Sequence, residues 1–594
     1  MRLALISLTT LLHCLQPFLL QSATAASTPD DRQPNVIIVM TDDQGYGDFG
    51  ATGNTVIQTP FIDQMARQSA SWQEFYVSPV CSPTRACLMT GRYNHRTKCI
   101  DTFKGRSMMA ADEVTLAEVL AENGYATGIF GKWHLGDNYP MRPTDQGFDQ
   151  ALVHKGGGLA QPSEPVENRS RYTDPLLFLN NREVATTGYC TDVFFDAALD
   201  FISDYSDSEQ PFFAYVPLNA PHGPFGDVPE NWYKRYRDTD FLPILPDRES
   251  VGADLQDRLA RISAMISNVD ENVGRLFARL EQLEITEDTL VIFLVDNGPN
   301  SDRFVGPFRG RKSQMYEGGI RSPIWFHMPG TLDADSIATT NVAAHIDIMP
   351  TVLDACGITE VPDGLDGRSM WPKLVDPAFE MPERPLVIQY HRGDVPVRNH
   401  SCMVRLGTWK LVHPSGTQKE VFEGEPAWEL YDLSADPGES NDVINENPAI
   451  AARLEEIYGR WFDDVVSTRA DQIGPPPIVI DPGFENPSIL TWQDIIDGSW
   501  RGDQIGYFKL EVASPGRYDI RFEARPGTDE SEYAGATAKL QLGDTVHETS
   551  YDAASRSAIF RAVDLPQGPV RLTPWIETTA GKQASIYHVW ISPR

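Results

Sequence analysis

The sequence predicts an α/β fold in which a large, mixed and mostly parallel β-sheet is sandwiched by helices. A smaller α+β subdomain and a C-terminal β-sandwich follow it. Short apolar runs first alternate with helical patterns, short strand patterns come next, and a period of two dominates the last part of the chain. With 594 residues, of which 41% are hydrophobic and 22% charged, the chain suits several globular domains.

Four apolar runs rich in β-branched and aromatic residues define the first region. They lie at residues 35–40, 125–130, 211–216 and 290–295. Continuous runs of this kind are typical of parallel strands that are buried on both faces. Helical patterns occupy residues 115–123 and 255–283 between the runs. We therefore assign residues 33–380 to the α/β domain.

The pattern changes near residue 385. Short strands are expected at residues 386–390, 402–406 and 409–412, and a helix at about 450–466. This order predicts an α+β subdomain over residues 381–472, packed on the first domain. Residues 473–479 contain Gly474-Pro-Pro-Pro477, a composition that indicates a stiff linker.

Beyond the linker, apolar and polar residues alternate. The alternation is clear at residues 508–512 and 518–522, on either side of a Pro-Gly turn. Further short strands are expected at 538–542, 559–563 and 586–591. The pattern predicts a β-sandwich over residues 480–594. Its tryptophans either fill the core or form a face that stacks on sugars; they are Trp492, Trp500, Trp575 and Trp590.

The N-terminus has the features of a targeting signal. Arg2 supplies a positive start, residues 3–12 form an apolar run, and Ala23-Thr24-Ala25 is an A-x-A cleavage site. The run is shorter than the roughly 18 apolar residues of a membrane span, and no later stretch reaches that length. We expect residues 1–25 to be a signal peptide and the mature chain to be exported, to the periplasm or outside the cell.

The charge balance excludes one class of partner. Asp and Glu number 83 against 50 for Lys and Arg, which gives a net charge of −33. A uniformly basic surface for nucleic acid is incompatible with this balance, so no nucleic-acid partner is expected. Seven cysteines are too few for a disulfide scaffold in a chain of this length.

Polar side chains follow each of the four apolar runs. In chain order they are Asp42 and Asp43, Lys132 and His134, His222, and Asp296 and Asn297. Ligands of open α/β sheets bind outside the carboxyl ends of the strands. We therefore expect these side chains to face one site.

The oxygen donors among them indicate a hard metal ion. Three carboxylates packed together repel one another unless a cation lies between them. Ligation by oxygen alone favours Ca²⁺ or Mg²⁺ over Zn²⁺. The basic side chains of Lys132, His134 and His222 would complete a site that holds a tetrahedral oxyanion, sulfate or phosphate.

A further motif, Cys81-Ser-Pro-Thr-Arg85, is followed by Leu88-Met-Thr-Gly-Arg92. Pro83 favours the start of a helix, and the free amides at a helix start attract anions and activate nucleophiles. Taken alone, Cys81 is either a thiol nucleophile or a structural cysteine. The pattern C-x-P-x-R followed by L-x-T-G-R, however, resembles the type I sulfatases of the alkaline-phosphatase superfamily.

The resemblance covers residues 33–470 and rests on several motifs in a fixed order. Besides the cysteine motif they are Thr41-Asp-Asp43, Gly131-Lys-Trp-His-Leu-Gly136, Pro221-His222, Asp296-Asn-Gly298, Arg309-Gly-Arg-Lys312, Tyr316-Glu-Gly-Gly-Ile-Arg321, His345-Ile-Asp-Ile-Met-Pro350 and Trp428-Glu-Leu-Tyr-Asp-Leu433. The fold that it implies is alkaline-phosphatase-like.

The resemblance implies a modified nucleophile. A maturation enzyme would oxidise Cys81 to formylglycine (3-oxoalanine), whose hydrate attacks sulfur, forms a covalent sulfo-enzyme intermediate and then expels sulfate. A serine or an unmodified cysteine cannot perform the second step.

The resemblance also implies roles for the other site residues. One Ca²⁺ per chain would be held by Asp42, Asp43, residue 81, Asp296 and Asn297. Arg85 and His134 would stabilise or deprotonate the hydrate, and Lys132 and Lys312 would neutralise sulfate oxygens. His222 would protonate the leaving alcohol.

Candidate specificity residues lie outside these motifs or at their edges. His154 and Lys155 precede three glycines, so they either reach the substrate or belong to an ordinary flexible loop. Arg309 and Arg311 flank Lys312 and either bind substrate or form salt bridges. His391 and Arg392 of the smaller subdomain are expected at the mouth of the pocket.

The sequence thus predicts an exported sulfatase that acts on a sulfated carbohydrate. One alternative is a phosphodiesterase or phosphonate monoester hydrolase of the same superfamily, but a Lys132/Lys312 pair beside a single metal favours sulfate. The other is a non-catalytic glycan-binding protein. The presence of a residue at every motif position argues against this alternative. The C-terminal sandwich is either a binding module or a domain that packs on the catalytic core.

Overall fold

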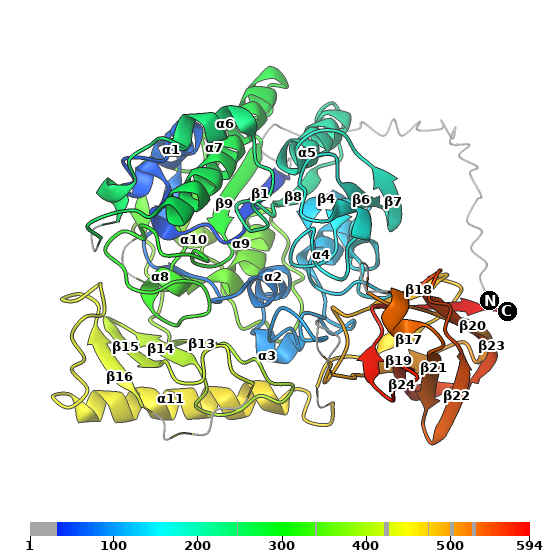
Figure 1. Cartoon of the computed structure of the whole chain (residues 1–594). Helices are drawn as coiled ribbons and strands as arrows, with labels where there is room; N and C mark the ends of the chain where they lie inside the picture. The colour runs from blue at the N-terminus through cyan, green and yellow to red at the C-terminus, as the bar shows by residue number, and fades with distance from the viewer. Residues whose placement is uncertain are drawn as a thin grey trace, which may run out of the picture. The chain divides into compact units, whose positions relative to one another are not determined.

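A ten-stranded sheet forms the central layer of the α/β domain in this computed structural model (Figure 1). The structure describes residues 33–245, 248–338, 341–420, 424, 427–472, 474–498, 504–525 and 530–594. The predicted signal peptide at 1–25, residue 473 of the predicted linker and Trp500 lie outside the described residues.

Five adjacent strands of this sheet are parallel. In spatial order they are β9 (Thr289–Val295), β1 (Asn35–Thr41), β8 (Phe212–Pro217), β4 (Ala126–Lys132) and β5 (Gln150–His154). The four predicted apolar runs form four of them. The fifth, β5, has only three apolar residues in a row and was not predicted as a strand.

Shorter strands extend the sheet at both edges. On one side lie β10 (Ile324–His327), β2 (Ala70–Trp72) and β11 (Ile337–Ala338), and on the other β6 (Leu176–Leu179) and β7 (Arg182–Ala185). Strands β10, β6 and β7 pair antiparallel with their neighbours. The predicted mixed, mostly parallel sheet is confirmed.

Helices cover both faces of the sheet, which explains why its strands are continuously apolar. Val36, Ile38 and Met40 of β1 pack in one core with α2 (Cys81–Thr90), α4 (Leu116–Glu122) and α9 (Ile348–Ala355). Ile37 and Val39 point to the opposite core, with α1 (Pro60–Arg67), α5 (Cys190–Ser206) and α7 (Ala253–Gln282). Short elements lie in the connections between these larger ones. They are the helices α3 (Asn94–Thr97), α6 (Glu230–Tyr236), α8 (Glu317–Ile320) and α10 (Trp371–Val375), and the paired strands β3 (Phe75–Tyr76) and β12 (Ala343–Ala344).

The smaller subdomain is an antiparallel sheet covered by one helix. Its strands are β13 (Leu386–Gln389), β14 (Cys402–Leu406), β15 (Trp409–His413) and β16 (Glu429–Asp432), and its helix is α11 (Pro448–Ser467). Val404 and Leu411 face Tyr458 of the helix, whereas Met403 and Val412 pack toward the α/β domain. The predicted α+β architecture is confirmed, with β16 as an additional strand.

Two sheets share one core in the C-terminal part. The first consists of β17 (Ile478–Ile480), β19 (Phe508–Val512), β24 (Gly568–Glu577), β21 (Thr537–Leu542), β22 (Thr545–Ser550) and β25 (Gln583–Ser585). The second consists of β18 (Ser488–Thr491), β26 (His588–Pro593), β20 (Gly516–Glu523) and β23 (Ser557–Leu565). Leu510 and Ile520 illustrate the inward-facing positions of the period-two pattern. Trp492 belongs to this core, while Trp575 and Trp590 are half-buried.

The sandwich packs directly against the α/β domain. Met108 and Met141, which precede the sandwich by more than 300 residues, belong to its hydrophobic core. The Asn138 side-chain amide donates to Glu485 (3.1 Å) and to the Ile489 carbonyl (3.0 Å). These contacts favour the packing role among the two interpretations of the sandwich.

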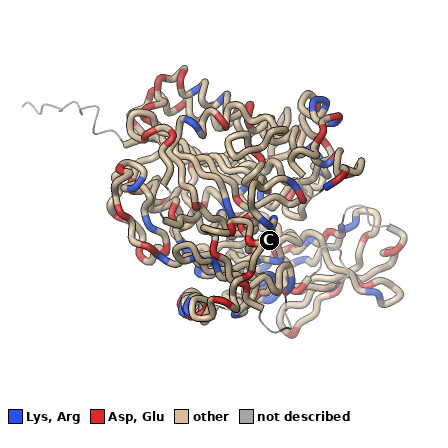
Figure 2. Tube along the Cα trace, turned by 90° about the vertical axis from the view of Figure 1, so that its left-hand side faces the viewer, with Lys and Arg blue, Asp and Glu red and all other residues tan. Residues whose placement is uncertain are grey.

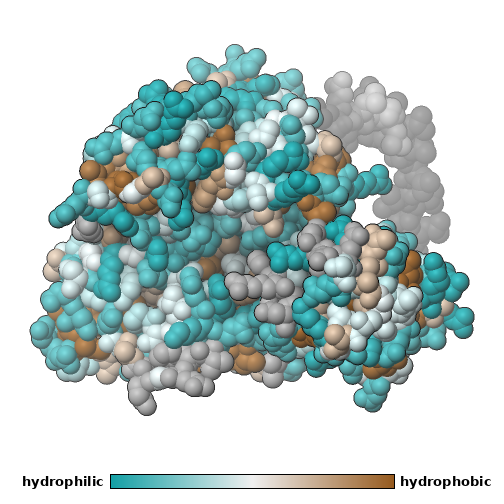
Figure 3. Space-filling view, in the orientation of Figure 1, coloured by the Kyte–Doolittle hydropathy of each residue, from teal (hydrophilic) through white to brown (hydrophobic). Residues whose placement is uncertain are grey.

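The surface is mainly polar. Acidic and basic residues are intermixed along the chain in Figure 2, and the face shown in Figure 3 is largely hydrophilic with small separate apolar areas. Within the described ranges, no helix combines the length and the apolar character needed to cross a membrane.

Two buried acids lie at the junction with the sandwich. Asp137 is 4% exposed and Asp494 is 2% exposed. Burial raises the pKa of Asp137 to about 7, with Lys155 opposing the shift and Glu164 adding to it. Burial, together with Asp137, raises the pKa of Asp494 well above its ordinary value. Both acids therefore resist ionisation in the folded protein.

We expect Asp137→Asn to stabilise the protein more at pH 8 than at pH 5. The folded-state pKa of this carboxyl lies above its unfolded value of 3.8, so the carboxyl lowers the free energy of unfolding progressively as pH rises from the unfolded pKa to the folded pKa. Above the folded pKa the whole destabilisation is present. The difference between the two pH values should be on the order of 2 kcal/mol. Unfolding in denaturant at both pH values measures it. Asp564→Asn, on an exposed carboxyl, is the control, and an equal effect of Asp137→Asn at both pH values would contradict the prediction.

Candidate active site

Three neighbouring parallel strands end at the same place and deliver polar side chains there. Asp42 and Asp43 follow β1, and Asp296 follows β9. The Asp42 amide donates to the Ala220 carbonyl (3.0 Å), beyond β8, and the Asp296 amide donates to the Thr41 carbonyl (3.0 Å). These bonds hold the strand ends together, as the sequence predicts for the carboxyl edge of a parallel sheet.

Tight backbone geometry brings the next strand into the same site. Gly131 in β4 has φ +147°, and a Cβ there would lie 2.0 Å from the Pro217 carbonyl oxygen of β8. Only glycine permits this approach. Asp43 and His134 have φ of 59° and 60°, in the left-handed region that is uncommon for residues with a side chain.

The carboxylates form a buried group of oxygen donors. Asp42, Asp43 and Asp296 are at most 2% exposed. One oxygen of Asp42, one of Asp296 and the Cys81 sulfur lie within 4.8 Å of one another. Asp42 Oδ1, Asp43 Oδ2 and Asn297 Oδ1 have no hydrogen-bond partner within the described parts of the chain. Buried oxygens without donors fit a hard cation such as Ca²⁺.

Each carboxylate also has a basic partner. Lys132 Nζ lies 2.5 Å from Asp42 Oδ2, Arg85 Nη2 lies 2.9 Å from Asp296 Oδ2, and Lys312 pairs with Asp43. Burial alone would raise the pKa of Asp42, but the cations, Lys132 first, hold it well below its usual value. Burial and the neighbouring Asp42 raise the pKa of Asp296 to about 7. The site is therefore a compact cluster of alternating charges.

Cys81 is the first residue of helix α2 and faces this cluster. The Thr84 hydroxyl donates to the Asp296 carbonyl (2.7 Å) and so ties the start of the helix to the end of β9. The Cys81 side chain is 2% exposed, and burial raises the pKa of its thiol although Lys132 and Lys312 oppose the shift. As a thiol, Cys81 is thus a weak nucleophile. Burial therefore favours the neutral thiol over the thiolate at this position.

Two histidines each commit one ring nitrogen to a backbone carbonyl. His134 Nε2 lies 2.9 Å from the Thr102 carbonyl oxygen, and His222 Nδ1 lies 2.5 Å from that of Gly223. The other nitrogen of His222 lies 3.7 Å from Asp43 Oδ2. Burial lowers the pKa of both imidazoles. Neutral rings with one free nitrogen are suited to proton transfer.

The structure does not bring all predicted specificity residues to this cluster. His154 ends β5 with no exposed surface, 3.7 Å from Glu164, and Lys155 lies over the Phe178 ring (4.4 Å). His391 is 1% exposed and its ring packs on His400.

Two of the remaining candidates are arginines held over aromatic rings. Arg392 lies over Phe103 (4.9 Å) and Arg309 over Tyr316 (3.9 Å). Arg309 also donates to the Glu439 carbonyl (2.8 Å).

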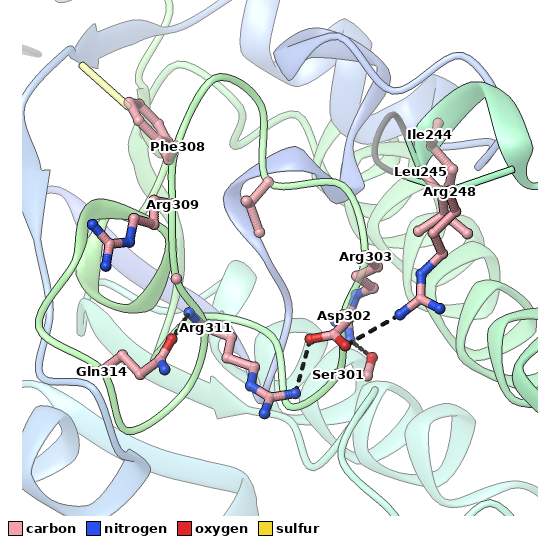
Figure 4. Close-up of a pocket in the computed structure, with 12 residues that line it drawn as sticks. Ile244, Leu245, Arg248, Ser301, Asp302, Arg303, Phe308, Arg309, Arg311 and Gln314 are labelled. Atoms are coloured by element: carbon pink, nitrogen blue, oxygen red, sulfur yellow. Dashed lines mark hydrogen bonds and ion pairs between the residues drawn. The ribbon is translucent and has the colours of Figure 1, made fainter. Parts of the chain in front are cut away.

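A cavity of about 700 Å³ is lined by four arginines (Figure 4). They are Arg248, Arg303, Arg309 and Arg311. Arg303 donates to the Asp43 carbonyl (2.5 Å), which connects the cavity wall to the carboxylate cluster. Asp302 pairs with Arg311 (2.9 Å) and Arg248 (3.3 Å).

Sequence reasoning missed two of these arginines. Arg303 follows the Asp296-Asn-Gly298 motif by five residues, and this spacing was the available signal. For Arg248 the sequence holds no signal.

Comparison with known proteins identifies related chains. A family model described as Sulfatase matches residues 34–358, and one described as N-sulphoglucosamine sulphohydrolase, C-terminal, matches residues 309–458. The N-acetylgalactosamine-6-sulfatase of Canis lupus familiaris is 30% identical over 398 residues, which are 62% of this chain and 70% of the relative. Arylsulfatase A of Homo sapiens is 29% identical over 483 residues, 73% of this chain and 89% of the relative.

Bacterial proteins and solved structures are similar as well. The N-acetylglucosamine-6-O-sulfatase of Bacteroides thetaiotaomicron is 26% identical over 547 residues, 77% of this chain and 91% of the relative. The crystal structure of Ps i-CgsB in complex with k-i-k-neocarrahexaose aligns with a TM-score of 0.62 and 26% identity, covering 74% of this chain and 94% of that chain.

We expect Ca²⁺ to stabilise metal-free protein, because it would separate three buried carboxylates. At a free concentration one hundred times the dissociation constant, the gain should be about 2.7 kcal/mol. Thermal unfolding after removal of metal with EDTA, with and without added Ca²⁺, measures this gain. Asp296→Asn should abolish most of it, since a proposed ligand charge is lost.

The control for this experiment is Asp238→Asn, at a carboxylate whose side chain is 83% exposed. This variant should keep the full Ca²⁺ response. A melting temperature of the unaltered protein that does not respond to Ca²⁺ would argue against a metal at this site.

Proposed function

Since the chain belongs to the sulfatase family and is a sulfuric ester hydrolase, we propose that it is an exported enzyme that removes sulfate from a sulfated glycan. It would use formylglycine at position 81 and one bound Ca²⁺. The observation that carries this proposal is the position of Cys81, at the start of α2 and within 4.8 Å of carboxylate oxygens that are themselves paired with Lys132 and Arg85.

The metal and the modified residue have a defined place in this proposal. Asp42, Asp43, Asp296, Asn297 and the side chain at position 81 would hold the Ca²⁺. When present, formylglycine supplies a hydrated aldehyde as the nucleophile, and Ca²⁺ supplies positive charge next to the sulfate oxygens.

The surrounding side chains then bind sulfate and move protons. Lys132 and Lys312 neutralise sulfate oxygens, and burial makes each contact stronger than it would be in water. Burial would lower the pKa of Lys312, but Asp43 raises it overall, so this lysine stays charged. Arg85, whose side chain is 1% exposed, fixes the orientation of Asp296 and stabilises negative charge at position 81.

The two histidines have different roles. His222 donates the proton that the leaving alcohol requires, from Nε2, the nitrogen that faces Asp43. This requires the protonated imidazolium form, which burial opposes and the negative charge of Asp43 favours. His134 accepts a proton from the side chain at position 81 through its free Nδ1. In both rings the nitrogen that takes part is the one not bound to a backbone carbonyl, Nε2 in His222 and Nδ1 in His134.

A glycan is the proposed substrate class for two reasons. The relatives include a protein named N-acetylglucosamine-6-O-sulfatase, and a similar structure was solved in complex with k-i-k-neocarrahexaose. The predicted signal peptide places the enzyme in the periplasm or outside the cell, where polysaccharides are encountered. A formylglycine-generating maturation enzyme is the required partner before or during export.

The mass of one tryptic peptide tests the modification. Residues 68–85 form a single peptide that contains Cys81. We expect an aldehyde in place of the thiol, and we expect the same preparation to release sulfate from sulfated oligosaccharides. Cys81→Ala should lower the rate by a factor of roughly 10⁴ or more, because it removes the nucleophile.

Matched substrates separate the proposed activity from its alternative. The unaltered protein should hydrolyse sulfate esters faster than phosphate esters of the same alcohol. An unmodified thiol, in a host that converts a known sulfatase in parallel, would contradict the proposal, as would a preference for phosphate.

We expect Arg311→Ala to weaken binding of a polyanionic glycan but not of a small aryl sulfate. Arg311 lies beside Lys312 in the arginine-lined cavity, and its side chain is 50% exposed. Loss of one charged contact should raise KM for a sulfated oligosaccharide by about fivefold to tenfold. KM for the aryl sulfate should change less than twofold.

Arg237→Ala, at an exposed arginine outside the cavity lining, is the matched control. If KM rises equally for both substrates, or rises for neither, the cavity does not bind the rest of the glycan.

A further inference from the structure

One loop of the sandwich reaches the active site. It follows β18 and contains Gln493, whose side chain is 1% exposed. The Gly105 amide donates to the Gln493 carbonyl (3.0 Å), so the loop is fixed to the segment of the α/β domain that carries Thr102 and Ser107. Met108, next to this segment, is buried in the sandwich core.

The Gln493 side chain contacts the same carbonyl that binds a catalytic histidine. Gln493 Nε2 donates to the Thr102 carbonyl at 2.8 Å, and His134 Nε2 lies 2.9 Å from the same oxygen. A carbonyl oxygen has two lone pairs and can accept both bonds. The two nitrogens are 3.4 Å apart, which is consistent with two donors that share one acceptor.

This geometry determines the orientation of both side chains. The reversed Gln493 amide would place its oxygen 2.8 Å from the Thr102 oxygen, where two acceptors repel. An unprotonated His134 Nε2 would face the same oxygen with a lone pair. The Thr102 carbonyl therefore selects the His134 tautomer that has hydrogen on Nε2.

The selected tautomer leaves the other ring nitrogen available for chemistry. His134 Nδ1 is buried and has no hydrogen-bond partner within the described residues. Burial lowers the pKa of His134 well below its ordinary value, so the ring is neutral and its Nδ1 carries a lone pair. The role proposed for His134, accepting a proton from position 81, requires this state.

We propose that Gln493, a residue of the C-terminal sandwich, is a positioning residue for His134. By donating to the Thr102 carbonyl, it holds the acceptor that fixes the ring orientation and tautomer of the histidine. Gln493 does not touch the substrate. The sandwich thereby completes the active site, a role distinct from binding a glycan. This inference rests on the proposed function of His134 as a proton acceptor.

Two substitutions of nearly equal length test the proposal. Gln493→Met keeps the packing volume but removes the donor, and Gln493→Glu places a carboxylate oxygen against the Thr102 carbonyl. We expect kcat to fall by roughly tenfold in the first and further in the second, because small errors in the position of a catalytic group slow the chemical step. KM should stay within twofold of the original value, since no substrate contact is lost.

The matched control is Asn138→Ala. Asn138 also joins the α/β domain to the sandwich, through Glu485 and Ile489, but it does not contact Thr102 or His134 in the hydrogen bonds of the described residues. Its melting temperature should fall at least as much as that of Gln493→Met, while its kcat stays near the original value. Equal losses of kcat in both variants would mean that Gln493 acts only through packing, and would overturn the proposal.

A second readout does not depend on activity. Nitrogen-15 NMR of histidine-labelled protein, made without the maturation enzyme and without Ca²⁺, reports which ring nitrogen of His134 is protonated. We expect protonated Nε2 in the original protein and a mixture of tautomers in Gln493→Glu. His134→Gln assigns the signal. An unchanged tautomer together with an unchanged kcat would overturn the inference.

The proposed function and the role of Gln493 can fail separately. A protein that hydrolyses no sulfate ester, although formylglycine is present, would contradict the proposed function. In that case the NMR experiment still decides whether Gln493 positions His134.

Discussion

The burial of three carboxylates at one edge of the sheet is the constraint on which the site depends. Asp42 and Asp296 each bring an oxygen to within 4.8 Å of the Cys81 sulfur, and Asp43 lies beside Asp42. Three cationic side chains, Lys132, Lys312 and Arg85, balance them. A divalent cation added to this balanced set leaves the site positive. A chain with a net charge of −33 can therefore still bind a sulfate ester.

The parts predicted from the sequence are those with a local signal. Strands β1, β4, β8 and β9 are continuously apolar because helices cover both faces of the sheet, and the polar residues directly after them converge because parallel strands end together. The period-two pattern is also a local signal, because alternate residues of each sandwich strand face the core between the two sheets, and it predicted the sandwich. The ordered motifs are the basis of the roles proposed for residue 81 and its neighbours, which spacing alone leaves open.

The parts that were not predicted depend on contacts between distant segments. His154 has the sequence context of a mobile loop, yet it ends the short strand β5 and is fully buried. Arg248 and Arg311 both pair with Asp302, and Gln493 reaches Thr102 across 391 positions of the chain. No local pattern records such contacts, because packing between elements decides which side chains face one another.

The difference between local signals and distant contacts also applies to the protonation of the two histidines. A strand end can place an imidazole in the site, but it does not determine which ring nitrogen carries the proton. Here backbone carbonyls outside the sheet determine it, Gly223 for His222 and Thr102 for His134. The carbonyl of Gly223 lies next to its own histidine in the chain. Thr102, by contrast, lies in a connection whose next residues bond to and pack against the sandwich, so the acceptor for His134 is held in place from outside the α/β domain.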